Sequence, residues 1–299
     1  MHEDAMRAVA PEAPEAGDTP ALRPAARRRT RLAAAGTVVM LTALSAVWAR
    51  AVSVSPMSIF MDHTTRTGTI TLYNPNPLPE EIDITFAFGY PVSDSAGDVS
   101  VPLYEQAPDG EPSATEWLRA FPRRLVLEPG QQQVVRILAQ PPADLPDGEF
   151  WSRILITATG GRPPVEQQVQ QDVRVAITMR TIVVASLNYR KGRVTTGLDV
   201  TDADLVRTDG GLQFTLDVSR RGEAAWLGRI RVQALDASDR VVAEQEDVIS
   251  VYRSLRRRFV FPDADGAVRI RYALETERPE LGQSNIITAP TVTGTTDLR

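Results

Sequence analysis

The chain has 299 residues, of which 42% are hydrophobic, which suits about two globular domains. Its formal net charge is -5 at pH 7, so it lacks the excess of basic residues that nucleic-acid binding requires. It contains no cysteine and only 2 histidines. Disulfides and thiolate nucleophiles are therefore excluded. With two histidines, a Ser-His-Asp triad or a histidine-ligated metal site is not expected.

Residues 1–51 have the pattern of a leader. An arginine cluster, residues 27–31, precedes an apolar segment, residues 32–48, and Ala49-Arg-Ala51 is like a signal-peptidase site. We expect a secretory signal peptide that is cleaved after Ala51. Because the apolar segment is only slightly shorter than a spanning helix of roughly 20 residues, an inner-membrane anchor formed by residues 32–48 is the alternative.

From Val52 onward, short runs of alternating apolar and polar residues are separated by Gly, Pro, Asn, Asp and Ser. This pattern predicts an all-β fold of two antiparallel β-sandwich domains. We expect the first domain over residues 52–186, the second over residues 187–290 and a flexible tail over residues 291–299. The strands expected in the first domain include residues 53–60, 67–73, 81–88, 124–128, 131–138 and 148–157.

One run from Val169 to Val184 holds no Gly or Pro and predicts a long strand. A period of two places Val173, Val175 and Ile177 on one face and Arg180 on the other. The simpler interpretation is an ordinary core strand. The other is an edge strand that pairs with a second chain, because a long apolar edge is otherwise an aggregation hazard.

Four segments of the first domain resemble the periplasmic pilus-assembly chaperones of the PapD type. The most specific is Arg124-Leu-Val-Leu-Glu-Pro-Gly-Gln-Gln-Gln-Val-Val-Arg-Ile137, a strand-turn-strand motif; the others are Val52-Ser-Val-Ser55, Thr69-Ile-Thr-Leu-Tyr-Asn-Pro-Asn76 and Leu145-Pro-Asp-Gly-Glu-Phe-Trp-Ser-Arg153. The resemblance covers roughly residues 52–187. It implies two immunoglobulin-like sandwiches set at an angle, a periplasmic location and the capping of pilin-like subunits by donor-strand complementation.

The resemblance also implies the residues that bind such a client. Val173, Val175 and Ile177 would be the donated side chains, and Arg180 would bind the client's C-terminal carboxylate in the cleft between the domains. A second basic anchor of the family falls at Ser58. Arg136 and Glu149 match a structural ion pair near the hinge, whose third member, an arginine, falls at Val184. An outer-membrane usher would be a further partner.

The sequence leaves two alternatives open. Arg180 could instead form a surface or hinge ion pair. The whole chain could be a periplasmic structural or adhesive protein with two immunoglobulin-like domains that assembles without chaperoning. No paired carboxylates, metal-ligand spacing or phosphate-binding loop is recognisable, so we expect no enzyme activity, no cofactor and no small-molecule substrate.

Overall fold

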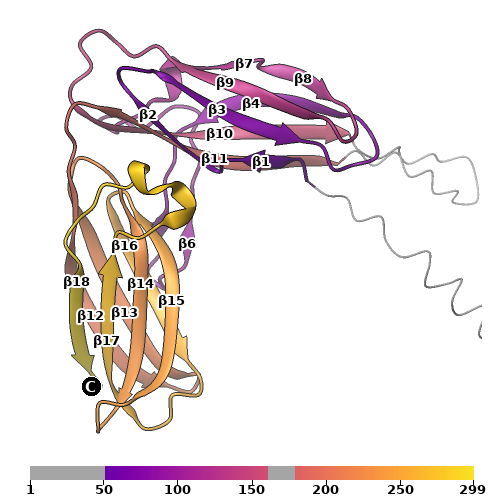
Figure 1. Cartoon of the computed structure of the whole chain (residues 1–299). Coiled ribbons are helices and arrows are strands. Elements are labelled where there is room, and N and C mark those ends of the chain that lie inside the picture. The colour runs from indigo at the N-terminus through magenta and orange to yellow at the C-terminus, as the bar shows by residue number, and fades with distance from the viewer. Residues whose placement is uncertain (1–50, 161–178) are drawn as a thin grey trace, which may run out of the picture. The chain divides into compact units, whose positions relative to one another are not determined.

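The computed structural model describes residues 51–160 and 179–299, which form two immunoglobulin-like β-sandwiches (Figure 1). The first sandwich consists of β1 (Ser53–Ser55), β2 (Ser58–Asp62), β3 (Thr67–Tyr73), β4 (Glu80–Ala87), β7 (Leu118–Phe121), β8 (Arg124–Leu127), β9 (Gln132–Ala139), β10 (Gly148–Gly160) and β11 (Arg180–Lys191). A short 3-10 helix, η1 (Thr115–Trp117), precedes β7.

The first sandwich has a four-stranded sheet in the order β1-β3-β9-β7 and a five-stranded sheet in the order β2-β11-β10-β4-β8. The run predicted as one strand over residues 53–60 is divided at Pro56, and its two halves join opposite sheets. β1 pairs antiparallel with β3, whereas β2 pairs parallel with β11. Proline has no N–H for a ladder, so a change of sheet at this position leaves no donor unpaired.

Alternation along each strand of the first sandwich sends apolar side chains between the sheets. Ile70 and Leu72 of β3, Ile84 of β4 and Ile156 of β10 are almost completely buried in this core. Because each such side chain stabilises the fold by about 1.5–3 kcal/mol when removed from water, the register of these strands is strongly specified.

The second sandwich consists of β12 (Thr196–Thr208), β13 (Gly211–Gly222), β14 (Trp226–Asp236), β15 (Val241–Val251), β16 (Ser254–Phe261), β17 (Ala267–Glu275) and β18 (Val292–Asp297). Its sheets have the orders β12-β13-β16 and β15-β14-β17-β18. Two 3-10 helices, η2 (Pro279–Leu281) and η3 (Gln283–Asn285), connect β17 to β18. Phe214, Trp226 and Ile230 lie at the centre of a separate core.

Two expected boundaries differ from the structure. The domain boundary predicted at residue 186 falls inside β11, which continues to Lys191 and keeps Tyr189 in the first core. The flexible tail predicted over residues 291–299 is wrong, because residues 292–297 form β18, an edge strand that pairs with β17. An ion pair between Arg269 and Asp297 (2.6 Å) adds to that pairing.

A third apolar cluster joins residues of the two sandwiches. Phe88 and Trp151 from the first contact Leu227 and Tyr252 from the second. The ring of Trp151 meets that of Tyr252 edge to face, with centroids 4.9 Å apart. We call this contact region the joint, because it holds residues from both sandwiches in one apolar environment.

Candidate functional site

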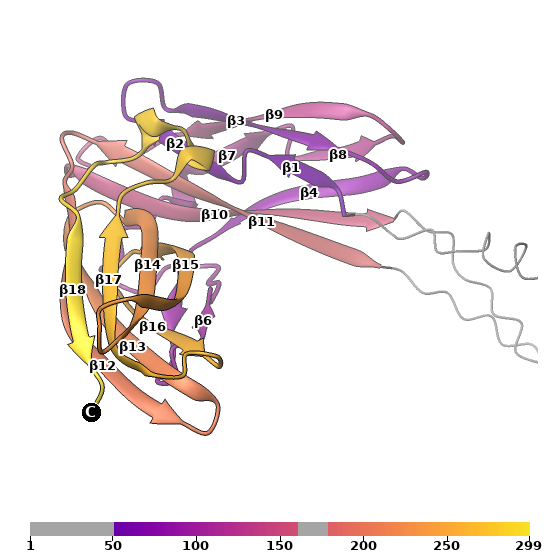
Figure 2. The ribbon, with the colours of Figure 1, turned by 60° about the horizontal axis from the view of Figure 1, so that its bottom comes forward.

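β11 connects the first sandwich to the second, and its two faces differ. Leu187 and Tyr189 point into the first core, whereas Val184, Ser186 and Asn188 line a cavity on the opposite face. One edge of β11 pairs with β10 along its whole length, and the two strands run side by side in both views (Figure 1, Figure 2).

The other edge of β11 is only partly covered. β2 pairs with Ser186–Arg190, and the N–H of Ser186 donates to Met57 O (2.9 Å). Among the residues that the structure describes, no strand pairs with residues 180–185 on this side. Because N–H groups alternate along a strand, those of Ile182 and Val184 point in the same direction as that of Ser186, toward the uncovered edge. Ile182 is also 48% exposed.

The long strand expected from the sequence is described from Arg180 onward, and it ends at Lys191 rather than Val184. Val173, Val175 and Ile177, the expected donated side chains, lie outside the described residues. Their role stays a prediction.

The structure does not place Arg180 at the cleft. Arg180 is the exposed first residue of β11, and the residue opposite Ser58 is Ser186, whose hydroxyl bonds to that of Ser58 (2.8 Å). Ser186 lies six positions after Arg180 along the strand, which corresponds to about 20 Å at about 3.3 Å per residue. The expected location of Arg180 in the cleft is therefore wrong, and its contact with a client stays a prediction.

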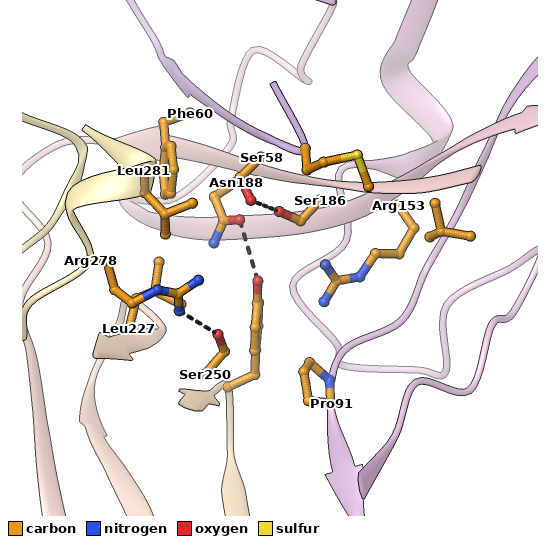
Figure 3. Close-up of a pocket in the computed structure, with 13 residues that line it drawn as sticks. Ser58, Phe60, Pro91, Arg153, Ser186, Asn188, Leu227, Ser250, Arg278 and Leu281 are labelled. Carbon is orange, nitrogen blue, oxygen red and sulfur yellow. Dashed lines mark hydrogen bonds between the residues drawn. The ribbon is translucent and has the colours of Figure 1, made fainter. Parts of the chain in front are cut away.

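A cavity of 220 Å³ lies beside β11 at the joint (Figure 3). Its lining combines hydroxyl, amide and guanidinium groups with apolar side chains, and no aspartate or glutamate is among the described residues that form it. The lining residues are Met57, Ser58, Phe60, Pro91, Arg153, Val184, Ser186, Asn188, Leu227, Ser250, Tyr252, Arg278 and Leu281.

Arg153 is a buried cation in this cavity. The residue is only 8% exposed, its Nε donates to Gly89 O (2.8 Å), and its guanidinium carbon lies 5.3 Å from the centroid of the Tyr252 ring. Neither Nη group has a hydrogen-bond or ion-pair partner among the described residues. The Nη groups are therefore available to donate charge-assisted hydrogen bonds to an anion in the cavity.

Arg278 lies across the cavity, and its guanidinium is turned toward that of Arg153 (Figure 3). Its Nη1 donates to Ser250 Oγ (3.3 Å) and its Nε pairs with Glu280 (2.5 Å). Arg278 is therefore largely neutralised, whereas Arg153 is not. Two guanidinium groups with intervening hydroxyls can bind a carboxylate through charge-assisted hydrogen bonds.

The expected ion pair between Arg136 and Glu149 is wrong. Arg136 lies exposed on β9 in the four-stranded sheet, whereas Glu149 lies on β10 in the five-stranded sheet, directly opposite Arg190 of β11. Arg190 Nε donates to Glu149 Oε2 (2.7 Å). Arg190, and not Val184, therefore supplies the arginine that was expected just past the long strand.

Glu149 also links the two sandwiches. Its Oε1 accepts hydrogen bonds from Trp151 Nε1 (2.9 Å), Asn188 Nδ2 (3.0 Å) and the N–H of Ala225 (2.9 Å), the last from the second sandwich. Asn188 in turn accepts from the hydroxyl of Tyr252 (3.4 Å) at the cavity. This buried network fixes the wall of the cavity.

Two other kinds of site are absent from residues 51–160 and 179–299. No group of three or more His, Cys, Asp or Glu side chains there is arranged to hold a metal ion. No helix in the same ranges combines the length and apolar character needed to cross a membrane.

No protein-family model and no curated protein sequence matches the chain. Solved structures with a similar fold include the YadV chaperone, at 12% identity and a TM-score of 0.45, over 83% of this chain and 99% of that one. A chain of the Salmonella enterica complex of the SafA pilin with the SafB chaperone has 13% identity and a TM-score of 0.43, over 83% of this chain and 98% of that one. A chain of the Acinetobacter baumannii CsuC–CsuE chaperone–tip adhesion subunit complex has 12% identity and a TM-score of 0.41, over 82% and 98%. Because all these TM-scores lie below 0.5, we base the functional proposal on the residues of this chain.

Proposed function

We propose that the chain is a non-enzymatic periplasmic chaperone that caps pilin-like β-sandwich subunits by donating strand to them. The observation that carries the proposal is the edge of β11 over residues 180–185, with which no strand of residues 51–160 and 179–299 pairs. The motifs quoted above from residues 52–187 favour the same function.

The uncovered edge offers a client both backbone and side-chain contacts. The peptide groups of Ile182 and Val184 are available to a strand of the client, each hydrogen bond contributing about 0.5–1.5 kcal/mol net. Met179 and Ile182 are both exposed, and Met179 follows Val173, Val175 and Ile177 in the same alternating series of the sequence. Arg180 lies where it would contact the client's strand rather than its terminus.

The cavity is the binding site that we propose for the client's C-terminal carboxylate. Ser58 and Ser186 occupy the positions where the two strands β2 and β11 meet, and neither carries a charge. Arg153 supplies the cationic group instead, and Arg278, which is paired with Glu280, adds guanidinium N–H donors on the facing wall. A hydrogen bond to a charged group contributes about 1.5–3 kcal/mol, so a carboxylate held by both arginines would fix the register of the client on β11.

The proposal is tested by affinity capture from the native periplasm with three tagged forms: wild type, Val175→Glu and Val242→Glu. Val242 is a 40% exposed valine on β15 of the second sandwich and serves as a matched control. We expect a stoichiometric small β-rich partner with wild type and Val242→Glu that is absent with Val175→Glu. A wild type recovered alone, or only with itself, would contradict the chaperone function and favour the structural or adhesive alternative.

A further inference from the structure

An excursion from the first sandwich contacts the second. Residues 89–104, which we call the strap, leave the end of β4 and return to it, because Phe88 and Tyr104 exchange two backbone hydrogen bonds of 2.8 Å. The strap contains a two-stranded hairpin, β5 (Val92–Ser93) and β6 (Val99–Ser100). A hairpin this short has little stability of its own, so its position depends on what it contacts.

The tip of the strap forms hydrogen bonds with the arginine-rich strand β16 (Figure 2). The N–H of Arg256 donates to Ser93 Oγ (2.7 Å), and Arg256 Nη1 donates to Ser95 O (3.1 Å). Arg258 Nη2 donates to Asp98 Oδ1 (3.0 Å). Three residues of the strap thus bind two arginines of the second sandwich.

Gly97 brings the strap close to β16. Its φ is +83°, and a Cβ at this position would lie 3.0 Å from both the N and the Cβ of Arg258. The strap therefore requires glycine here both for the backbone conformation and for contact with β16.

The base of the strap holds the buried cation of the cavity. Gly89 O accepts from Arg153 Nε (2.8 Å), and Pro91 forms part of the cavity wall. Between them, Tyr90 stacks on Tyr252 with ring centroids 5.7 Å apart, the same ring over which Arg153 lies. The strap thus supplies the carbonyl that accepts from Arg153 and one residue of the wall, and its Tyr90 packs on the Tyr252 ring over which Arg153 lies.

We propose that the strap positions Arg153 for carboxylate binding by transmitting the position of β16 to the cavity. Arg256 and Arg258 hold the tip of the strap through hydrogen bonds. The hairpin connects this tip to Gly89, whose carbonyl oxygen orients the Arg153 guanidinium. The expected effect on carboxylate binding rests on the proposed function. The coupling between β16 and Arg153 rests only on the contacts of the strap with both.

The test compares Gly97→Ala with Gly110→Ala in the purified protein. Gly110 has nearly the same φ, +82°, but a Cβ there would meet nothing within 4 Å, so the two variants share the backbone strain and differ in contact with β16. Two signals are followed by NMR: hydrogen exchange of the Arg153 Nε–H and of the Arg256 amide. The carboxylate probe is N-acetylglycine, and its neutral control is N-acetylglycine amide.

We expect Gly97→Ala to accelerate exchange of both groups at least about tenfold and to weaken N-acetylglycine binding at least about fivefold, with Gly110→Ala at wild-type values. Faster exchange at Arg256 alone, with Arg153 exchange and probe binding unchanged, would overturn the proposal. If N-acetylglycine fails to bind even wild type while exchange at Arg153 responds to Gly97→Ala, the strap's coupling is supported and the carboxylate site of the proposed function is refuted.

A second pair of variants keeps the test independent of backbone strain. Asp98→Asn removes the charge that Arg258 contacts, and Asp109→Asn removes a charge from an exposed turn. We expect faster Arg153 exchange with Asp98→Asn alone. Equal exchange rates in these two variants would contradict the coupling.

Discussion

Replacing Glu149 with glutamine tests the buried network at the joint. Three donors reach Oε1 of Glu149, from Trp151, Asn188 and Ala225. A glutamine that keeps its carbonyl oxygen at that position retains all three bonds. Its amide NH₂ then faces Arg190 Nε, so a charge pair of 2.7 Å becomes a contact between two donors.

The expected cost follows from the burial of the pair. The Glu149 side chain is 0% exposed and that of Arg190 is 16% exposed. Breaking a buried ion pair costs about 3–5 kcal/mol. Because Arg190 keeps a hydrogen bond to Asn285 O (2.7 Å), we expect Glu149→Gln to lower the free energy of unfolding by about 2–3 kcal/mol.

The assay is urea denaturation followed by tryptophan fluorescence, with Glu246→Gln as control. Glu246 pairs with Arg229 at 2.8 Å, with both side chains more than one third exposed, so its replacement is expected to cost about 0–1 kcal/mol. A loss with Glu149→Gln no larger than that with Glu246→Gln would refute the idea that this pair stabilises the joint.

Three further changes test other parts of the structure. Arg153→Met is expected to weaken client binding at least about tenfold while changing the free energy of unfolding by only about 1 kcal/mol; unchanged affinity in a titration would contradict the anion site. Burial and the neighbouring Arg66 lower the pKa of His63, so its contribution to stability is complete above pH 6.5 and is lost as the pH falls through the folded-state pKa. The thermal midpoint of wild type should therefore fall more between pH 7 and pH 5 than that of His63→Gln, and parallel midpoints would exclude this linkage. Gly228→Ala would place a Cβ 2.2 Å from the backbone of β17 and should lower the free energy of unfolding by at least about 2 kcal/mol. Gly197→Ala, whose Cβ would have its nearest contact at 3.6 Å, should be nearly neutral. Similar losses for the two variants in urea denaturation would refute the steric argument.

Local alternation was sufficient to locate most strands. The strand expected over residues 81–88 is β4, Glu80–Ala87, and that expected over residues 131–138 is β9, Gln132–Ala139. In these segments one face is buried and the other is not, so the period of two is visible in the sequence itself. The long excursion after β4 carries no such period, and the strap could not be recognised.

The position of the anchor could not be derived in the same way. Arg180 and Ser186 are an even number of residues apart, so a period of two places both on the same face of β11. Only the pairing of β11 with β2 distinguishes them, and that pairing sets Ser58 opposite Ser186. Register between distant strands depends on contacts that single-strand periodicity does not encode.

Arg153 and Arg278 were missed for a related reason. They come from different sandwiches and meet only at the joint. One signal was present, because Arg153 ends the Leu145–Arg153 segment that resembles the family. Arginine is rarely buried unless it is paired. An arginine such as Arg153, within a strand that alternation predicts to be half-buried, therefore indicates a candidate buried charge.

The most direct test of strand addition is amide hydrogen exchange along β11, measured by NMR in the free protein and in its complex with the captured client. Ile182 and Val184 direct their N–H groups to the uncovered edge, whereas those of Val183 and Ala185 point toward β10 and serve as internal controls. If a client strand adds to β11, exchange at Ile182 and Val184 slows at least about tenfold in the complex, while Val183 and Ala185 stay protected in both states. Unchanged rapid exchange at Ile182 and Val184 in a complex that has formed would contradict the account.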